Sequence, residues 1–273
     1  MSPLRRFDRG LLRFDLRDDG PEDGFPVLLL HGFPQDGTSW SRVVPHLHAA
    51  GLRTLVPDQR GYSPGARPPG RGAYRLEFLV ADVLGLLDSL GLARVHLVGH
   101  DWGGGVAWAA AARAPERTAS LTVLSTPHPA AMLASMPRSR QPLRSGYMAA
   151  FQLPALPERL IAPRLEQALR RRGLPAADAG RYARRMREPA TLTAALNWYR
   201  ALPMSHVRTP PVTVPTTYVW GARDFALGRT AAELTERYVH APYRFVELSA
   251  GHWLPETEAD EVAAAIIART RAT

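Results

Sequence analysis

The sequence predicts an α/β fold in which helices cover both faces of a mostly parallel sheet. Short, almost continuously apolar runs recur along the chain, and each ends at a glycine or a turn. Strands of this composition are buried on both faces, as in parallel sheets. Helical patterns separate several of these runs, and such alternation is typical of a doubly wound sheet. With 273 residues, the chain is long enough for one sizeable core.

Six buried strands are expected, at 25–30, 53–57, 95–98, 121–124, 217–220 and 245–248. Helical patterns lie between them at 79–90, 103–114 and 231–238. The opening segment, 7–17, alternates more clearly between apolar and polar residues. We expect this segment to form an antiparallel ribbon at the edge of the sheet.

Residues 127–211 interrupt this rhythm because they contain no buried-strand pattern. Prolines at 154, 157, 163, 175 and 189 separate amphipathic helical segments such as 160–172 and 176–187. We therefore expect a helical lid, residues 127–211, inserted between two parts of one core domain, 1–126 and 212–273.

The composition excludes several classes of protein. Hydrophobic residues make up 45% of the chain and charged residues 22%, which is ordinary for a soluble globular protein. All 34 basic residues are arginine and the net charge is +9, but the arginines are spread along the chain, so no nucleic-acid partner is expected. The absence of cysteine excludes disulfides, thiolate metal sites and a cysteine nucleophile. Without a membrane-spanning run or a signal-peptide pattern, we expect a cytoplasmic protein with no membrane partner.

Asp101 lies in the strongest motif, G-H-D-W-G-G at 99–104, between an expected strand and an expected helix. The small residues permit the sharp turn of a nucleophile elbow, with aspartate in the position where esterases hold serine. An aspartate at a helix start can also be a simple N-cap, but a cap does not need the two glycines that follow. A carboxylate nucleophile attacks an sp³ carbon that bears a strained or good leaving group, and forms an alkyl ester that water must cleave.

His252 and Asp224 are the expected partners of this nucleophile. His252, in S-A-G-H-W, follows the last expected strand, and Asp224, in W-G-A-R-D, follows the strand before it. An acid bonded to one ring nitrogen leaves the other nitrogen free to take a proton from water. Phe33, in H-G-F-P at 31–34, also follows a strand, and its backbone N–H with that of Trp102 is expected to form an oxyanion hole.

With these residues in place, the chain resembles the epoxide hydrolases of the α/β-hydrolase fold. The resemblance rests on H-G-F-P (31–34), D-Q-R-G-Y-S (58–63), G-H-D-W-G-G (99–104), P-H-P (127–129), G-A-R-D (221–224) and G-H-W (251–253). In the expected lid, Y-x-x-x-F-Q at Tyr147 and N-W-Y-R at Tyr199 resemble the segments that supply two tyrosines to the epoxide oxygen. The resemblance implies conversion of an epoxide and water to a vicinal diol, without a metal or an organic cofactor.

We expect the substrate pocket to lie under the lid and to include His31, Pro34, Phe151 and Trp198. Two alternatives remain open. The core motifs also resemble those of haloalkane and haloacetate dehalogenases, although Phe33 stands where the haloalkane enzymes often place an asparagine. A protein that keeps the site but only binds a small molecule under its lid is the other alternative.

Overall fold

The computed structural model describes residues 4–205 and 208–273. Eight strands within these residues form one sheet. The strands are β1 (Arg5–Arg9), β2 (Leu12–Asp19), β3 (Pro26–Leu30), β4 (Arg53–Pro57), β5 (Val95–His100), β6 (Thr118–Leu124), β7 (Thr216–Gly221) and β8 (Tyr243–Leu248). Their order is β1-β2-β4-β3-β5-β6-β7-β8. The pairs β1–β2 and β2–β4 are antiparallel and the others are parallel. The predicted α/β fold, with its antiparallel edge ribbon, is confirmed.

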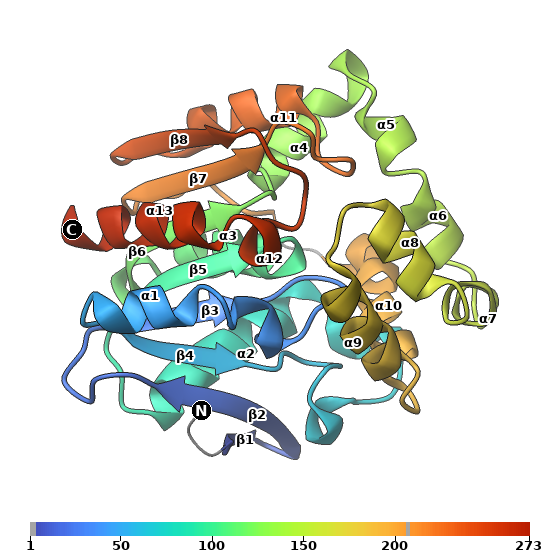
Figure 1. Ribbon diagram of the computed structural model, residues 1–273, viewed down its shortest axis with the longest axis horizontal. Coiled ribbons are helices and arrows are strands. Elements are labelled where there is room, and N and C mark those ends of the chain that lie inside the picture. Colours follow the sequence, from blue (N-terminus) through green and yellow to red (C-terminus); the bar gives the residue numbers. More distant parts are fainter. Residues whose placement is uncertain (1–3, 206–207) are drawn as a thin grey trace.

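Helices cover both faces of the sheet (Figure 1). Helices α2 (Leu76–Ser89) and α3 (Trp102–Arg113) cover one face, while α1 (Val44–Ala49) and α13 (Ala259–Arg271) cover the other. Strand β3 shows how the sequence specifies this arrangement. Leu28 and Leu30 belong to the core under α2 and α3, whereas Val27 and Leu29 belong to the core under α1 and α13. Since successive side chains alternate between faces, a strand covered on both sides is apolar at every position.

Short helices fill the chain between β6 and β7 and lie beyond the ends of the parallel strands (Figure 1). They are α4 (Pro129–Ser135), α5 (Gln141–Arg144), α6 (Tyr147–Phe151), α7 (Leu156–Ile161), α8 (Leu165–Arg171), α9 (Ala176–Met186) and α10 (Thr191–Ala201). The single helix expected at 160–172 is wrong. Pro163 separates α7 from α8, because proline lacks an N–H and its ring clashes with the preceding turn.

Helix α4 packs against α11 (Arg229–Leu234), beside the sheet (Figure 1). We therefore propose that the lid proper begins after α4 and that helices α5 to α10 cover the edge of the sheet. In the described part of the chain, no helix has both the length and the apolar character needed to cross a bilayer.

The turn between β5 and α3 brings three backbone segments into close contact. A Cβ atom on Gly99 would lie 2.6 Å from the carbonyl carbon of Gly103, and one on Gly103 would lie 2.5 Å from that of Leu30. Between these glycines, Asp101 adopts a φ of 51°. This conformation costs a residue with a side chain about 1–3 kcal/mol, and it persists only where the surrounding packing enforces it. The packing of β3 against the start of α3 thus holds Asp101 in a strained position.

We expect Gly103→Ala to lower the free energy of unfolding by about 1–3 kcal/mol, because the added methyl group forces β3 and α3 apart. Gly105→Ala is the matched control in the same helix, since a Cβ there meets no atom within 4 Å. This control should be neutral or stabilise the protein by up to about 1 kcal/mol. Chemical denaturation measures both values, and equal effects of the two substitutions would show that the turn is not tightly packed.

Candidate active site

Asp101 presents its carboxylate to a cavity. Although the residue directly precedes α3, its side chain makes no helix-capping hydrogen bond. Oδ1 accepts a hydrogen bond of 2.8 Å from the backbone N–H of Phe33, and the N–H of Trp102 also stabilises the carboxylate. These are the two N–H groups expected to form an oxyanion hole. The arrangement favours a nucleophile over a simple N-cap, since a cap would accept the N–H of the second or third helical residue.

His252 lies between two carboxylates. Its Nδ1 is 2.8 Å from Oδ2 of Asp224, and its Nε2 is 3.6 Å from Oδ2 of Asp101. Asp224 is held in place because its Oδ1 accepts the N–H groups of Ala226 and Leu227, at 2.7 and 3.0 Å. When the ring is neutral, the bond to Asp224 keeps the proton on Nδ1 and leaves Nε2 as the acceptor. The structure thus brings the three side chains together in the expected order of contacts.

The charges of Asp101 and Asp224 strongly affect the pKa of His252. Burial by itself lowers the pKa of His252, but the charge and hydrogen bond of Asp224, together with the charge of Asp101, raise this pKa to about 9. Burial raises the pKa of Asp101, while His252 and the N–H groups of Phe33 and Trp102 lower it. At neutral pH, His252 therefore carries a proton in the resting site. A reaction that removes the charge of Asp101 lowers the pKa of His252.

Two phenols from the lid face the cavity that contains Asp101. Tyr199 on α10 is buried, with its ring centroid 4.9 Å from that of Trp102 and 5.5 Å from that of Phe33. Tyr147 on α6 lies 6.0 Å from Tyr199, measured between ring centroids, and the two phenols share a hydrogen bond. Desolvation of the phenol groups and the nearby charge of Asp101 raise the pKa of both phenols above the ordinary value. Both groups therefore stay protonated and can donate hydrogen bonds.

The cavity has a volume of about 240 Å³ and lies between the lid and the carboxyl ends of the strands. Pro34 and Phe151 line it, together with Phe33. The sequence analysis did not identify the other lining side chains, which are Ile161, Leu165, Ala168, Leu169, Arg172, Phe225, Ala226 and Trp253. Most of them are apolar, so the site suits a substrate with an apolar substituent. Among residues 4–205 and 208–273, no group of three His, Asp or Glu side chains is placed to hold a metal ion.

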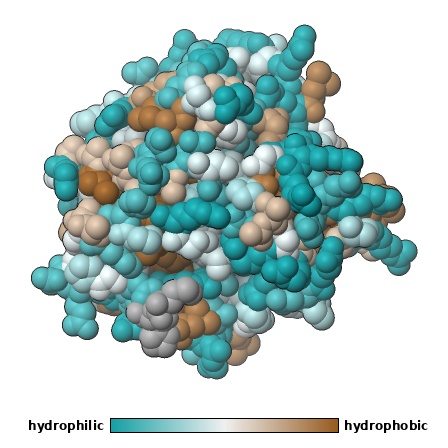
Figure 2. All heavy atoms as spheres, viewed as in Figure 1, coloured by the Kyte–Doolittle hydropathy of each residue, from teal (hydrophilic) through white to brown (hydrophobic). Residues whose placement is uncertain are grey.

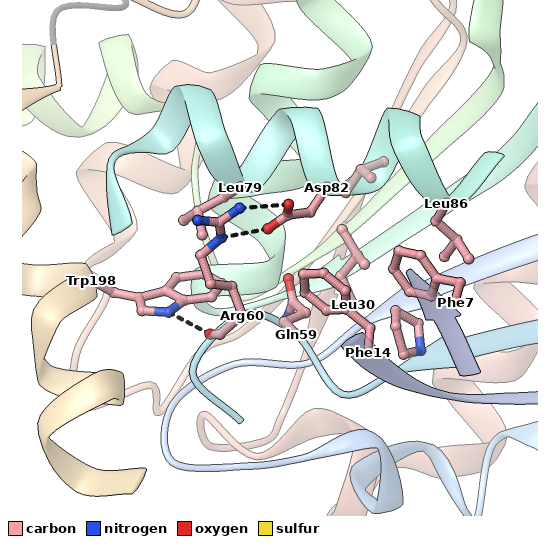
Figure 3. A pocket seen from close by; sticks show the side chains of 11 residues that line it. Phe7, Phe14, Leu30, Gln59, Arg60, Leu79, Asp82, Leu86 and Trp198 are labelled. Carbon is pink, nitrogen blue, oxygen red and sulfur yellow. Dashed lines mark hydrogen bonds and ion pairs between the residues drawn. The ribbon is translucent and has the colours of Figure 1, made fainter. Parts of the chain in front are cut away.

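His31 and Trp198 do not line this cavity, which corrects their assignment to the substrate pocket. His31 is buried, and its ring nitrogens contact the Gln59 N–H and the Gly32 carbonyl, each at 3.1 Å. Trp198 donates its indole N–H to the Arg60 carbonyl at 2.9 Å. It lines a separate cavity of about 20 Å³ next to α2 (Figure 3). Both side chains therefore lie outside the cavity and support the residues around it. They would not contact a substrate bound there.

A buried polar network behind His252 was not identified from the sequence. The side chain of Gln35 is 2.8 Å from Nδ1 of His100, and it donates to Glu256 at 2.7 Å. Tyr182, from α9 of the lid, donates to the same carboxylate oxygen at 2.8 Å. Nε2 of His100 is 2.9 Å from the His252 carbonyl. Burial raises the pKa of Glu256 to about 7. The network joins the lid to the backbone of His252. Its members are far apart in the sequence, so no local pattern predicts their contacts.

Comparison with known proteins places these residues in a family context. The model of the α/β hydrolase fold family matches residues 26–259. The AB hydrolase superfamily protein YfhM of Bacillus subtilis is 37% identical, over 86% of each chain. Epoxide hydrolase A of Mycobacterium tuberculosis is 33% identical, over 90% of each chain. Among solved structures, Epoxide Hydrolase A from Mycobacterium thermoresistibile superposes with a TM-score of 0.85 over 98% of each chain, at 28% identity.

Asp101→Asn is expected to lower the pKa of His252 from its wild-type value of about 9, because the amide removes one of the charges that stabilise the imidazolium. The measurement is a pH titration of isotopically labelled histidine followed by NMR. Asp260→Asn is the control, since Asp260 is exposed and its side chain pairs with His46. An unchanged His252 pKa in Asp101→Asn would contradict the ion pair described above.

Proposed function

Because the chain belongs to the epoxide hydrolases of the α/β-hydrolase family, we propose that it converts an epoxide to a vicinal diol through an ester formed on Asp101. One observation carries the proposal. The two oxygens of this carboxylate have different surroundings, since Oδ1 accepts the Phe33 N–H and Oδ2 faces His252 and the cavity. Oδ1 is therefore held by a backbone N–H, while Oδ2 faces the space where a substrate would bind.

In the proposed first step, Oδ2 of Asp101 attacks an epoxide carbon. A bond forms between this oxygen and the carbon, and the strained carbon–oxygen bond breaks. The ring oxygen gains negative charge and is a poor leaving group in water. The phenols of Tyr147 and Tyr199 donate hydrogen bonds to it, and one phenol supplies the proton. Their protonated state at neutral pH, which follows from their raised pKa values, supports this role.

In the proposed second step, His252 has lost its resting proton, which replaces the one that the phenol gave up in the first step. His252 then takes a proton from water, and the hydroxide attacks the acyl carbon of the ester. The charge that develops lies on the oxygen held by the Phe33 and Trp102 N–H groups. The bond between the acyl carbon and the alkyl oxygen then breaks, and the hydroxyl proton of the new carboxyl group passes to the alkyl oxygen. This releases the diol and restores Asp101 as a carboxylate. Once Asp101 is esterified, it no longer raises the pKa of His252, so the imidazole is a better acceptor for this proton.

The two lid phenols favour an epoxide over a haloalkane as the substrate. A halide leaves as an anion that needs no proton, so a dehalogenase has no use for paired proton donors at this place. Phe33 offers a backbone N–H and no side-chain donor. The apolar lining indicates an epoxide with a hydrophobic substituent.

His252→Ala is expected to accumulate the ester, because the variant lacks the base that activates water and ester decay should slow by about 10²-fold or more. Intact mass spectrometry after addition of a styrene-type epoxide should show a gain equal to the whole mass of the epoxide. Peptide mapping should place it on Asp101.

The double variant Asp101→Asn/His252→Ala is the control and should stay unmodified. A mass gain at another residue, or unmodified His252→Ala under conditions where the wild type turns over, would contradict the ester. A haloalkane that modifies His252→Ala when no epoxide does so would indicate a dehalogenase instead.

A further inference from the structure

Arg200 follows Tyr199 in the sequence, but its side chain contacts the other half of the lid. It is 6% exposed, and its guanidinium binds the turn between α6 and α7. Nε donates to the Phe151 carbonyl at 2.9 Å, and Nη2 donates to the Leu153 carbonyl at 2.7 Å. Both carboxylate oxygens of Glu158 accept from the same guanidinium, at 2.7 and 3.0 Å. One buried side chain thus satisfies two carbonyls and a carboxylate within residues 151–158.

Helix α6 depends on such external contacts. It has five residues, no side-chain cap and no buried residue. A helix this short is not stable by itself, and its last carbonyls have no partner within the helix. Tyr147 is its first residue and Phe151 its last, and their rings lie 5.2 Å apart. Holding the Phe151 carbonyl therefore also fixes the place of the Tyr147 phenol.

Of the two helices that carry the phenols, α6 and α10, helix α10 is the one that is bonded to the core domain. Trp198 donates to the Arg60 carbonyl, and the Arg60 guanidinium forms two bonds of 2.6 and 2.7 Å to Asp82 of α2 (Figure 3). These contacts tie α10 to the core domain. The Tyr199 carbonyl accepts a further bond of 2.9 Å from Gln152, in the same turn that Arg200 holds.

We propose that Arg200 is the positioning residue that sets the separation of the two phenols, by holding the turn 151–158 against α10. The inference rests on the proposed function, in which Tyr147 and Tyr199 together bind the epoxide oxygen. Arginine suits this task because its planar fork carries five donors, whereas a lysine ammonium cannot reach two carbonyls and a carboxylate from one point. Arg200 does not contact the reacting atoms.

The test compares Arg200→Lys with Arg159→Lys, a substitution of an exposed arginine in the same lid. Rapid quenching and intact mass spectrometry measure ester formation and ester decay separately. We expect Arg200→Lys to slow ester formation about 10–100-fold, because a displacement of about 1 Å has this cost. Ester decay should change by less than about twofold, since His252 and Asp224 are untouched. Arg159→Lys should match the wild type in both steps.

A double-mutant cycle separates positioning from general support of the fold. Tyr147→Phe should slow ester formation about 10²-fold in the wild type, but by less than about threefold when Arg200→Lys has already displaced this phenol. Glu158→Gln, which keeps the shape of the partner, should give an intermediate loss in ester formation alone.

Three results would overturn the inference. The first is ester formation by Arg200→Lys at the wild-type rate. The second is equal slowing of both steps together with a lowered melting temperature. The third is an effect of Tyr147→Phe on ester formation that is as large in the double variant as in the wild type. If both tyrosine substitutions slow ring opening and Arg200→Lys does not, only this inference fails. If no epoxide is turned over and neither tyrosine matters, the proposed function fails as well.

Discussion

The two oxygens of the Asp101 carboxylate are held in different surroundings, one 2.8 Å from the Phe33 N–H and the other 3.6 Å from Nε2 of His252. This difference exists because the backbone at Asp101 is forced to a φ of 51°, between two glycines that admit no side chain. If the turn relaxed, the carboxylate would move away from both partners. The histidine after β8, the N–H after β3 and the lid phenols are all placed with respect to this single group.

Electrostatics links the two chemical steps of the proposed cycle. In the resting site, the carboxylates of Asp101 and Asp224 flank one imidazole and raise its pKa to about 9. Esterification removes one of these charges, so His252 becomes able to accept a proton from water at neutral pH only after the nucleophile has reacted. Asp224 keeps the ring oriented through its bond to Nδ1. The Gln35, His100 and Glu256 network holds the backbone of His252 while these charges change.

Local patterns allowed much of the fold and the side chains that meet in the candidate site to be predicted. Apolar runs bounded by glycine mark strands that are buried on both faces, and the glycines around Asp101 reflect contacts within one turn. Other features depend on distant partners. Trp198 and Tyr199 are neighbours on one helix, so their side chains point about 100° apart, and only tertiary packing decides which of them faces the cavity. Likewise, Gln35 and Glu256 are separated by 221 residues, and no local pattern encodes their bond.

The central claim is that the oxygen delivered to the product comes from Asp101 and not directly from water. A single turnover, with enzyme in excess over an epoxide and in water labelled with a heavy oxygen isotope, tests this most directly. The account predicts an unlabelled diol and one heavy oxygen in the Asp101 carboxylate, because water attacks the acyl carbon and the original carboxylate oxygen leaves with the product. A labelled diol together with an unlabelled Asp101 would contradict it.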